Sequence, residues 1–323
     1  MDTLFVSKDC RLRREDSTLV VTTGRSTRRR VPIEGLRHIV IAGEAQLTTA
    51  VLGLCGRSGV RVTILDWRGN VTGCFEPKGT PSSGKVHLLQ AKHASDPELR
   101  MKLAKAFVHG AGANILANLR YRVWRGARDV APICRKIEHI LGRLAEAETS
   151  ESLMGFEGQI RSFYYDAWSL VDQRLSFGPR RRRPPNNPMN CLISWFNGLA
   201  YSLVRNEIAK THLDDSISFL HSSQESRSSL SLDLSEVFKP AICDTLIFEV
   251  VLRDEIEDRW FHQEDGVCRL SESGRRATLE RWVRKIEDRG ASESFRELVR
   301  AEALAVERHV LGIATYKSWK RKV

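Results

Sequence analysis

The chain changes its hydrophobic pattern once. Up to about residue 77, apolar residues come in short β-branched runs separated by turn residues, as in TLFVS, STLVVTT, HIVIAG and GVRVTILD. Runs of this length and composition predict strands. One stretch, AQLTTAVLGLCGRSG, has the longer apolar spacing of a helix, which Gly56 or Gly59 is expected to end. The first part of the chain is therefore predicted to be a small β-rich domain.

From Pro97 onward, apolar residues recur at i, i+3, i+4 and i+7, which is the spacing of amphipathic helices. Between the two patterns, EPKGTPSSGK concentrates Gly, Pro and Ser and is typical of a linker. We predict an α+β protein, with long loops at GPRRRRPPNNP and SSQESRSS. Its parts would be a small N-terminal β-rich domain, residues 1–85, and a larger all-α C-terminal domain, residues 86–323.

Composition and charge predict the kind of binding partner and the cellular compartment. The 323 residues include 51 Lys and Arg against 40 Asp and Glu, a formal net charge of +11. A chain of this length favours two domains with separate cores. The positive charge favours a polyanionic partner, nucleic acid before an anionic membrane surface. Without a run of about 18 apolar residues or a signal-peptide pattern, we expect a cytoplasmic protein that does not bind membranes.

Two classes of chemistry find no support in the sequence. The seven cysteines are scattered and never form C-x-x-C, which favours free thiols over disulfides or a structural zinc site. The chain also lacks the glycine-rich phosphate-binding motifs of ATP-driven and dinucleotide-dependent enzymes.

One acid stands between two glycines in LMGFEG, where Gly155 and Gly158 flank Glu157. Ser150 or Ser152 is expected to cap the helix that contains this motif. Glycine inside a helix costs about 1 kcal/mol relative to alanine, so this pair indicates close approach of another backbone or of a ligand. The alternative is a surface glutamate beside a helix-packing contact, because glutamate is usually exposed.

Two further acids lie in SLDLSEVF, where Asp233 and Glu236 share one face of a predicted helix. The apolar residues around them predict burial, and burial raises carboxyl pKa values unless cations or hydrogen bonds compensate. Alternatively, Asp233 caps the helix and Glu236 faces water. His221 follows the apolar ISFL and is either structural or a ligand. Together with Glu157, these acids and one imidazole would suit Mg²⁺ or Mn²⁺, and next to a polyanion such a site indicates phosphodiester chemistry.

Basic and polar clusters complete the candidates. A run of four arginines precedes two prolines and is either a phosphate clamp or a solvated stretch of charge; it comprises Arg180, Arg181, Arg182 and Arg183. His212, Asp214 and Asp215 are close in sequence but fall in a predicted loop, where a polar surface is the simpler interpretation.

Several of these segments carry a family resemblance. LMGFEG, FGPRRRRPPNNPMNCLISWFNGLAYSLVRNEI, FLH and SLSLDLSEVFKP occur in the order and spacing of the C-terminal domain of the CRISPR-associated adaptation integrases, the Cas-one family. VPIEGLRHIVIAG, LCGRSGVRVTILD and GNVTG resemble the β-domain of that family. The resemblance covers nearly the whole chain, and four ordered motifs are more specific than any single one.

The resemblance implies a catalytic metal site for Mg²⁺ or Mn²⁺ formed by Glu157, His221 and Glu236. Asp233 either supports these ligands from behind or is an occasional ligand itself. Lys239 stands where the family often has arginine and can contact phosphate without a bidentate fork. Asp215 stands where the family often has proline, which changes the loop before His221.

The resemblance also implies a reaction and partners. The expected activity is that of a metal-dependent DNA endonuclease and integrase that inserts captured fragments into the repeat array by attack of a 3′-hydroxyl on a phosphodiester. The expected substrates are duplex DNA, branched DNA and DNA with single-stranded 3′ ends. The expected protein partners are a second copy, paired through the β-domain, and a small ferredoxin-like adaptation protein. The alternatives are a catalytically inactive DNA-binding scaffold and a general metal-dependent nuclease of DNA repair.

Overall fold

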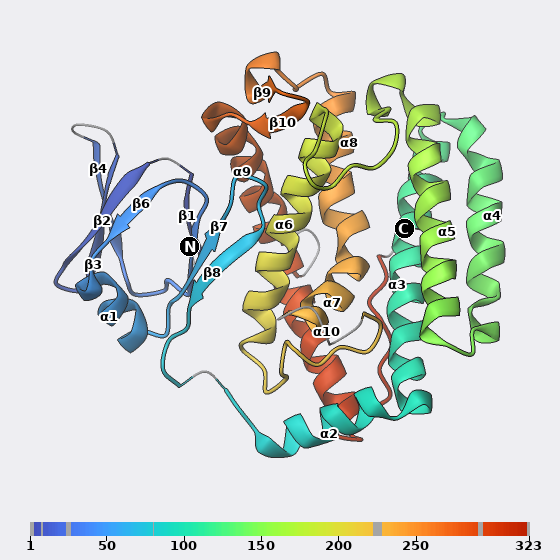
Figure 1. Cartoon of the computed structure of the whole chain (residues 1–323), viewed down its shortest axis with the longest axis horizontal. Coiled ribbons are helices and arrows are strands. Elements are labelled where there is room, and N and C mark those ends of the chain that lie inside the picture. Colours follow the sequence, from blue (N-terminus) through green and yellow to red (C-terminus); the bar gives the residue numbers. More distant parts are fainter. Residues whose placement is uncertain are drawn as a thin grey trace. The chain divides into compact units, whose positions relative to one another are not determined.

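The computed structural model describes residues 3–7, 9–23, 27–79, 81–221, 228–289 and 293–321 (Figure 1). The chain forms two compact units. The first comprises Met1–Pro81, Arg181–Ser202 and Glu257–Arg284, and the second comprises Ser82–Arg180, Leu203–Ile256 and Lys285–Val323. The predicted fold class is confirmed, because strands dominate the N-terminal part and helices follow. The prediction that the C-terminal part is all-α misses one β-hairpin.

The N-terminal part of the first unit contains two four-stranded sheets, with strand orders β1-β5-β7-β8 and β4-β3-β2-β6. In β3, Leu19 and Val21 are buried and enter a core shared with Leu12, Ile39 and Val60. The elements are β1 (Thr3–Val6), β2 (Cys10–Glu15), β3 (Thr18–Thr23), β4 (Thr27–Pro32), β5 (His38–Ile41), β6 (Ala45–Leu47), α1 (Thr49–Arg57), β7 (Arg61–Leu65) and β8 (Val71–Phe75).

Later segments complete the first unit. They are the first part of α6 (Pro188–Ile208), the hairpin β9 (Phe261–Glu264) and β10 (Val267–Leu270), and most of α9 (Glu272–Glu287). A Cβ added to Gly198 of α6 would lie 2.0 Å from the Gly69 carbonyl oxygen, so only glycine fits where this helix meets the turn between β7 and β8. A chain cut near residue 86 would therefore separate α6 from a backbone segment that it contacts.

The second unit is helical and is centred on α3. The side chain of Asp96 accepts hydrogen bonds from the backbone N–H groups of Glu98 and Leu99, and Pro97 follows at the first helical position. Helix α3 contacts α4, α5 and α7, and Figure 1 shows α3, α4 and α5 running alongside one another. The helices are α2 (Gly84–Ser95), α3 (Pro97–Trp124), α4 (Ala131–Gly142), α5 (Ser150–Val171), α7 (Ser229–Lys239), α8 (Thr245–Leu252), α10 (Phe295–Val310) and the end of α6.

A π-helical turn, η4 (Pro240–Asp244), joins α7 to α8. Pro240 has no backbone N–H, so the regular α-helical ladder cannot continue through it. The Pro240 carbonyl oxygen instead accepts from the side chains of Asn118, at 2.5 Å, and Thr245, at 3.1 Å. The buried Asp244 ends this turn, directly before α8.

The C-terminal segment packs within the second unit. Glu302, in α10, accepts hydrogen bonds from the Tyr316 hydroxyl, the Ser318 hydroxyl and the Trp319 backbone N–H. The Trp319 ring then stacks on Phe238 of α7 at 5.1 Å between centroids. The segment thus supports the helix that carries Asp233 and Glu236. Among the helices the structure describes, none is both long and apolar enough to cross a membrane.

Candidate active site

Helix α5 carries the first acid. Its N-cap is Thr149, whose hydroxyl accepts from the Ser152 backbone N–H at 3.2 Å, while the Ser152 hydroxyl accepts from the Thr149 N–H at 3.3 Å. The prediction that Ser150 or Ser152 caps this helix was therefore wrong, because threonine caps as serine does and lies one position earlier. Ser152 contributes the second half of the capping box.

The two glycines beside Glu157 leave open space. A Cβ added to Gly155 or Gly158 would meet no atom of the described residues within 4 Å. The close backbone approach that we expected here is therefore absent from that part of the chain, and the space is open to a ligand. The Glu157 side chain is 30% exposed.

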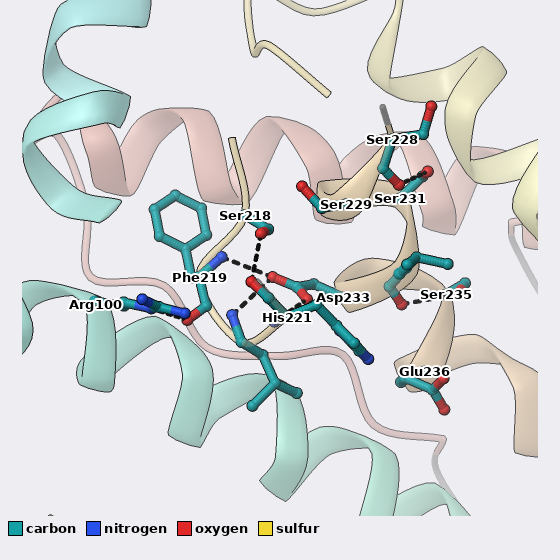
Figure 2. A network of polar contacts seen from close by, with 12 residues as sticks. Arg100, Ser218, Phe219, His221, Ser228, Ser229, Ser231, Asp233, Ser235 and Glu236 are labelled. Atoms are coloured by element: carbon teal, nitrogen blue, oxygen red, sulfur yellow. Dashed lines mark hydrogen bonds and ion pairs between the residues drawn. The ribbon is translucent and has the colours of Figure 1, made fainter. Parts of the chain in front are cut away.

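Asp233 is the centre of a hydrogen-bond network (Figure 2). Its carboxylate is fully buried and accepts the backbone N–H groups of Phe219 at 2.8 Å, Leu220 at 2.9 Å and His221 at 3.0 Å. The same carboxylate accepts from His221 Nδ1 at 2.7 Å. Four donors compensate for the loss of water around the buried carboxylate. The alternative in which Asp233 caps its own helix is wrong, since Asp233 lies inside α7 and holds the segment before His221.

This network orients the His221 ring. Because Nδ1 donates to Asp233, Nε2 is the nitrogen available to a ligand when the ring is neutral. The hydrogen bond to Asp233 raises the pKa of His221, against the opposing effect of burial, and the charge of Glu236 adds to the rise. His221 and Glu236 are thus near enough to interact electrostatically, and Figure 2 shows their side chains on the same side of α7.

Loop contacts hold the start of α7 beside His221. Asp215 accepts the backbone N–H of Ser231 through Oδ1 at 2.8 Å, and its carbonyl oxygen accepts the N–H of Leu230 at 3.0 Å. Arg100 donates to the Phe219 carbonyl oxygen at 2.7 Å. The aspartate that stands in place of the expected proline therefore has a local role in fixing the first turn of α7. The rest of the serine-rich loop, residues 222–227, lies outside the described residues.

Glu236 is bound by two cations. Arg161, in α5, donates from Nη2 to Oε2, and Lys239 donates to Oε1 at 2.5 Å. Only 14% of the Glu236 side chain and 5% of the Lys239 side chain are exposed. Burial alone would raise the pKa of Glu236, but the charges of Lys239 and Arg161 lower it to about 2. The alternative in which Glu236 faces water is wrong, and Lys239 lies next to the acids as expected.

Sequence reasoning missed Arg161 and Asp244. The Nε atom of Arg161 lies 3.6 Å from Oε1 of Glu157, one helical turn earlier. Asp244 is 2% exposed, and burial raises its pKa to about 6 although the charge of Arg161 opposes the rise. Its Oδ2 has no hydrogen-bond partner among the described residues. The available signals were a cation four residues after Glu157 and a single acid in the apolar run AICDTLIF.

The structure brings the predicted ligands into one region without closing them around a common point. Arg161 links Glu157 to Glu236, and His221 lies within electrostatic reach of Glu236. Over the described ranges, no three His, Cys, Asp or Glu side chains are close enough to hold a metal ion as they stand. The donor types nevertheless fit Mg²⁺ or Mn²⁺, and the unpartnered Asp244 oxygen shows that acceptor capacity remains.

A basic cavity lies in the same unit and was not predicted from the sequence. Its volume is about 760 Å³, and residues of α3, α5 and α8 contribute to its wall. Asn118 joins it to α5 by donating to the Tyr164 hydroxyl at 3.2 Å. Two carboxylates also line it, Asp129 and Glu249. The cavity therefore has an excess of positive charge from its five arginines, which are Arg122, Arg125, Arg128, Arg253 and Arg321.

The remaining candidates are the arginine run and the polar residues around His212. Arg181, Arg182 and Arg183 are exposed, and Arg180 is partly buried. The imidazole of His212 pairs with Glu307 at 2.9 Å, so it forms no local cluster with Asp214 and Asp215.

Comparison with known proteins identifies relatives of this chain. A family model described as CRISPR associated protein Cas1 matches residues 4–284. The CRISPR-associated endonuclease Cas1 of Fusobacterium nucleatum is 33% identical to this chain over an alignment of 323 residues. The alignment covers 98% of this chain and 95% of that protein. The solved structure of a Cas1 protein from Thermotoga maritima has a TM-score of 0.89 and 29% identity, covering 99% of this chain and all of the other.

Two solved structures of lower identity share the fold. A casposase bound to integration product is 19% identical with a TM-score of 0.81, covering 100% of this chain and 96% of the casposase chain. A chain in a Cas6-RT-Cas1–Cas2 complex is 17% identical with a TM-score of 0.86, covering 99% of this chain and 36% of the other. Because the family model spans most of its residues and a relative above 30% identity matches nearly its full length, the chain belongs to the Cas1 family of CRISPR-associated proteins.

Proposed function

We propose that this protein is a metal-dependent DNA endonuclease and integrase of CRISPR adaptation. The observation that carries the proposal is the arrangement around α7: Asp233 fixes the tautomer of His221, and Glu236 lies nearby with Arg161 linking it to Glu157. The endonuclease names of full-length relatives support DNA cleavage. The shared fold of a casposase bound to its integration product is consistent with strand transfer.

The reaction exchanges one phosphodiester for another. The 3′-hydroxyl of a captured fragment attacks a phosphorus atom of the repeat, a new P–O bond forms and the bond to the leaving 3′-oxygen breaks. The attacking hydroxyl loses one proton and the leaving oxygen gains one, so no external energy source is needed. With water as the attacking group, the same site hydrolyses DNA to a 5′-phosphate and a 3′-hydroxyl.

The residues divide this work. Glu157, His221 and Glu236 would hold Mg²⁺ or Mn²⁺, which supplies charge neutralisation at the non-bridging oxygens and the leaving oxygen. Asp233 keeps Nε2 of His221 available. Lys239 adds positive charge beside the site, and the basic cavity offers a second surface for DNA phosphates.

The proposal includes the partners that the resemblance implies. We infer that two copies pair through the N-terminal β-domain and bind a small ferredoxin-like adaptation protein in the cytoplasm. The fold shared with a chain of a Cas6-RT-Cas1–Cas2 complex is consistent with a Cas partner. The positive formal charge and the arginine-lined cavity support DNA as the substrate.

A DNA-binding scaffold is the second candidate, because both oxygens of Glu236 already have cationic partners. The two functions are separated by incubating the protein with branched and half-site DNA, with Mn²⁺, with Mg²⁺ and with a chelator. We expect cleavage and joined products with metal and none with chelator. Tight DNA binding without any metal-dependent product would instead establish the scaffold.

The arginine run gives a separate prediction. Replacing Arg180, Arg181, Arg182 and Arg183 together by glutamine should weaken binding similarly on different DNA sequences. The slope of log K against log salt should flatten by up to about 0.9 for each phosphate of duplex DNA that the variant no longer neutralises. Fluorescence anisotropy at several salt concentrations measures this slope. The matched control replaces the same residues by lysine and should retain the wild-type slope; equal slopes for all three proteins would show that the run is only a solvated stretch of charge.

A further inference from the structure

Arg161 occupies the space between two acids that the proposed function assigns to the metal. Its Nη2 donates to Oε2 of Glu236, and its Nε lies 3.6 Å from Oε1 of Glu157. Lys239 binds the other oxygen of Glu236 at 2.5 Å. Each Glu236 oxygen therefore already has a cationic partner. Lone pairs remain on both oxygens, but a metal ion that binds this carboxylate directly must come close to at least one of the two cations, which repels it.

The surroundings explain why a guanidinium lies here. The Arg161 side chain is 14% exposed and interacts with Glu157, Glu236 and Asp244. Without a cation, three acids of which two are largely buried would repel one another at high energetic cost. Arg161 therefore acts as the internal counter-ion of this acidic cluster in the metal-free protein.

We propose that Arg161 is the resting-state cation of the candidate metal site, and that it releases Glu236 when a divalent ion binds. This inference rests on the proposed function, since it concerns the same acids. Two cations next to one buried carboxylate repel each other strongly when little water screens them. The affinity for metal then depends on two quantities: how strongly the ligands bind the ion, and how much free energy is needed to displace Arg161 from Glu236.

Arg161 fits this exchange better than Lys239. Arg161 reaches Glu236 from the other helix and also touches Glu157, so its departure frees both acids together. Its long side chain can change rotamer while α5 stays in place. Lys239 is held on the same helix three residues after Glu236 and can keep its oxygen while the second oxygen turns to the metal.

The test measures Mn²⁺ binding and metal-free stability in the full-length Arg161→Gln variant. We expect the metal-free melting temperature to fall, because buried acids lose their counter-ion. We expect the Kd for Mn²⁺, measured by calorimetry, to fall by about tenfold or more, equivalent to about 1.4 kcal/mol. Arg161→Lys keeps the charge and should stay near the wild-type Kd. Arg143→Gln removes an exposed pair with Glu146 and should change neither quantity.

Opposite changes in stability and metal affinity are the signature of the exchange. Weaker or unchanged Mn²⁺ binding in Arg161→Gln would overturn it and make Arg161 a support for the ligands. If wild type and variant both fail to bind Mn²⁺, the metal site itself fails, and the proposed function fails with it. Should the glutamine variant not fold, ¹⁵N spectra of the wild-type guanidinium groups decide: the Arg161 signal, assigned with Arg161→Lys, should shift on adding Mg²⁺, and an unchanged signal would contradict the exchange.

Discussion

Alanine at Glu157, His221 or Glu236 is expected to abolish DNA cleavage and strand transfer. The three side chains supply the proposed metal ligands, and alanine removes the imidazole or the carboxylate altogether. DNA affinity should stay within about threefold of wild type, because Lys and Arg contacts to phosphates provide most of it. Cleavage of branched DNA, joining on half-site DNA and anisotropy measure the three quantities.

Matched variants separate catalysis from stability in this experiment. Glu236→Ala leaves Arg161 and Lys239 without their shared anion, so part of any loss can come from a weakened fold. Glu236→Gln keeps the shape, and Glu146→Gln removes an exposed carboxylate on another helical segment as a control. Full activity of any one of the three alanine variants would remove that residue from the site.

Alanine at Asp233 is expected to cause the largest loss of stability among the site variants. Three backbone N–H groups and the His221 ring would lose their buried acceptor. Breaking one such buried charged network costs about 3–5 kcal/mol. Activity should fall as well, since His221 would no longer be held with Nε2 toward the ligand. Urea unfolding gives the stability, and the Mn²⁺-dependent cleavage rate gives the activity.

Ser235→Ala is the matched control for Asp233→Ala. Ser235 is also fully buried in α7, but its hydroxyl donates within the same helix, to the Leu232 carbonyl oxygen. Loss of this hydrogen bond should lower the free energy of unfolding by about 1 kcal/mol. If Asp233→Ala proved as stable as Ser235→Ala, the network around Asp233 would not hold the His221 segment.

The burial of the acids in α7 could be predicted from the sequence, but their binding partners could not. The spacing of Asp233 and Glu236 predicted a shared buried face, and both are largely buried. Their partners could not be read from α7 itself. The donors to Asp233 come from a loop more than ten residues earlier, and the cation on Glu236 comes from Arg161, 75 positions away. Contacts at this separation depend on how α5 and α7 pack, which local periodicity does not specify.

The missed hairpin β9–β10 has a different cause. Its turn contains Asp265 and Gly266, both with positive φ angles, and Asp-Gly between short apolar runs is a strong hairpin signal. The signal was present in FHQEDGVCRL, but it stands among segments with clear helical spacing. The basic cavity could not be found in this way, since its arginines come from three segments distant in sequence.

Anomalous diffraction from crystals soaked in Mn²⁺ shows whether Glu157, His221 and Glu236 form one metal site. We expect a manganese peak ligated by oxygens of Glu157 and Glu236 and by Nε2 of His221, with Nδ1 still bonded to Asp233. A protein that cleaves DNA with Mn²⁺ but binds its manganese away from these three side chains would show that they do not form the site.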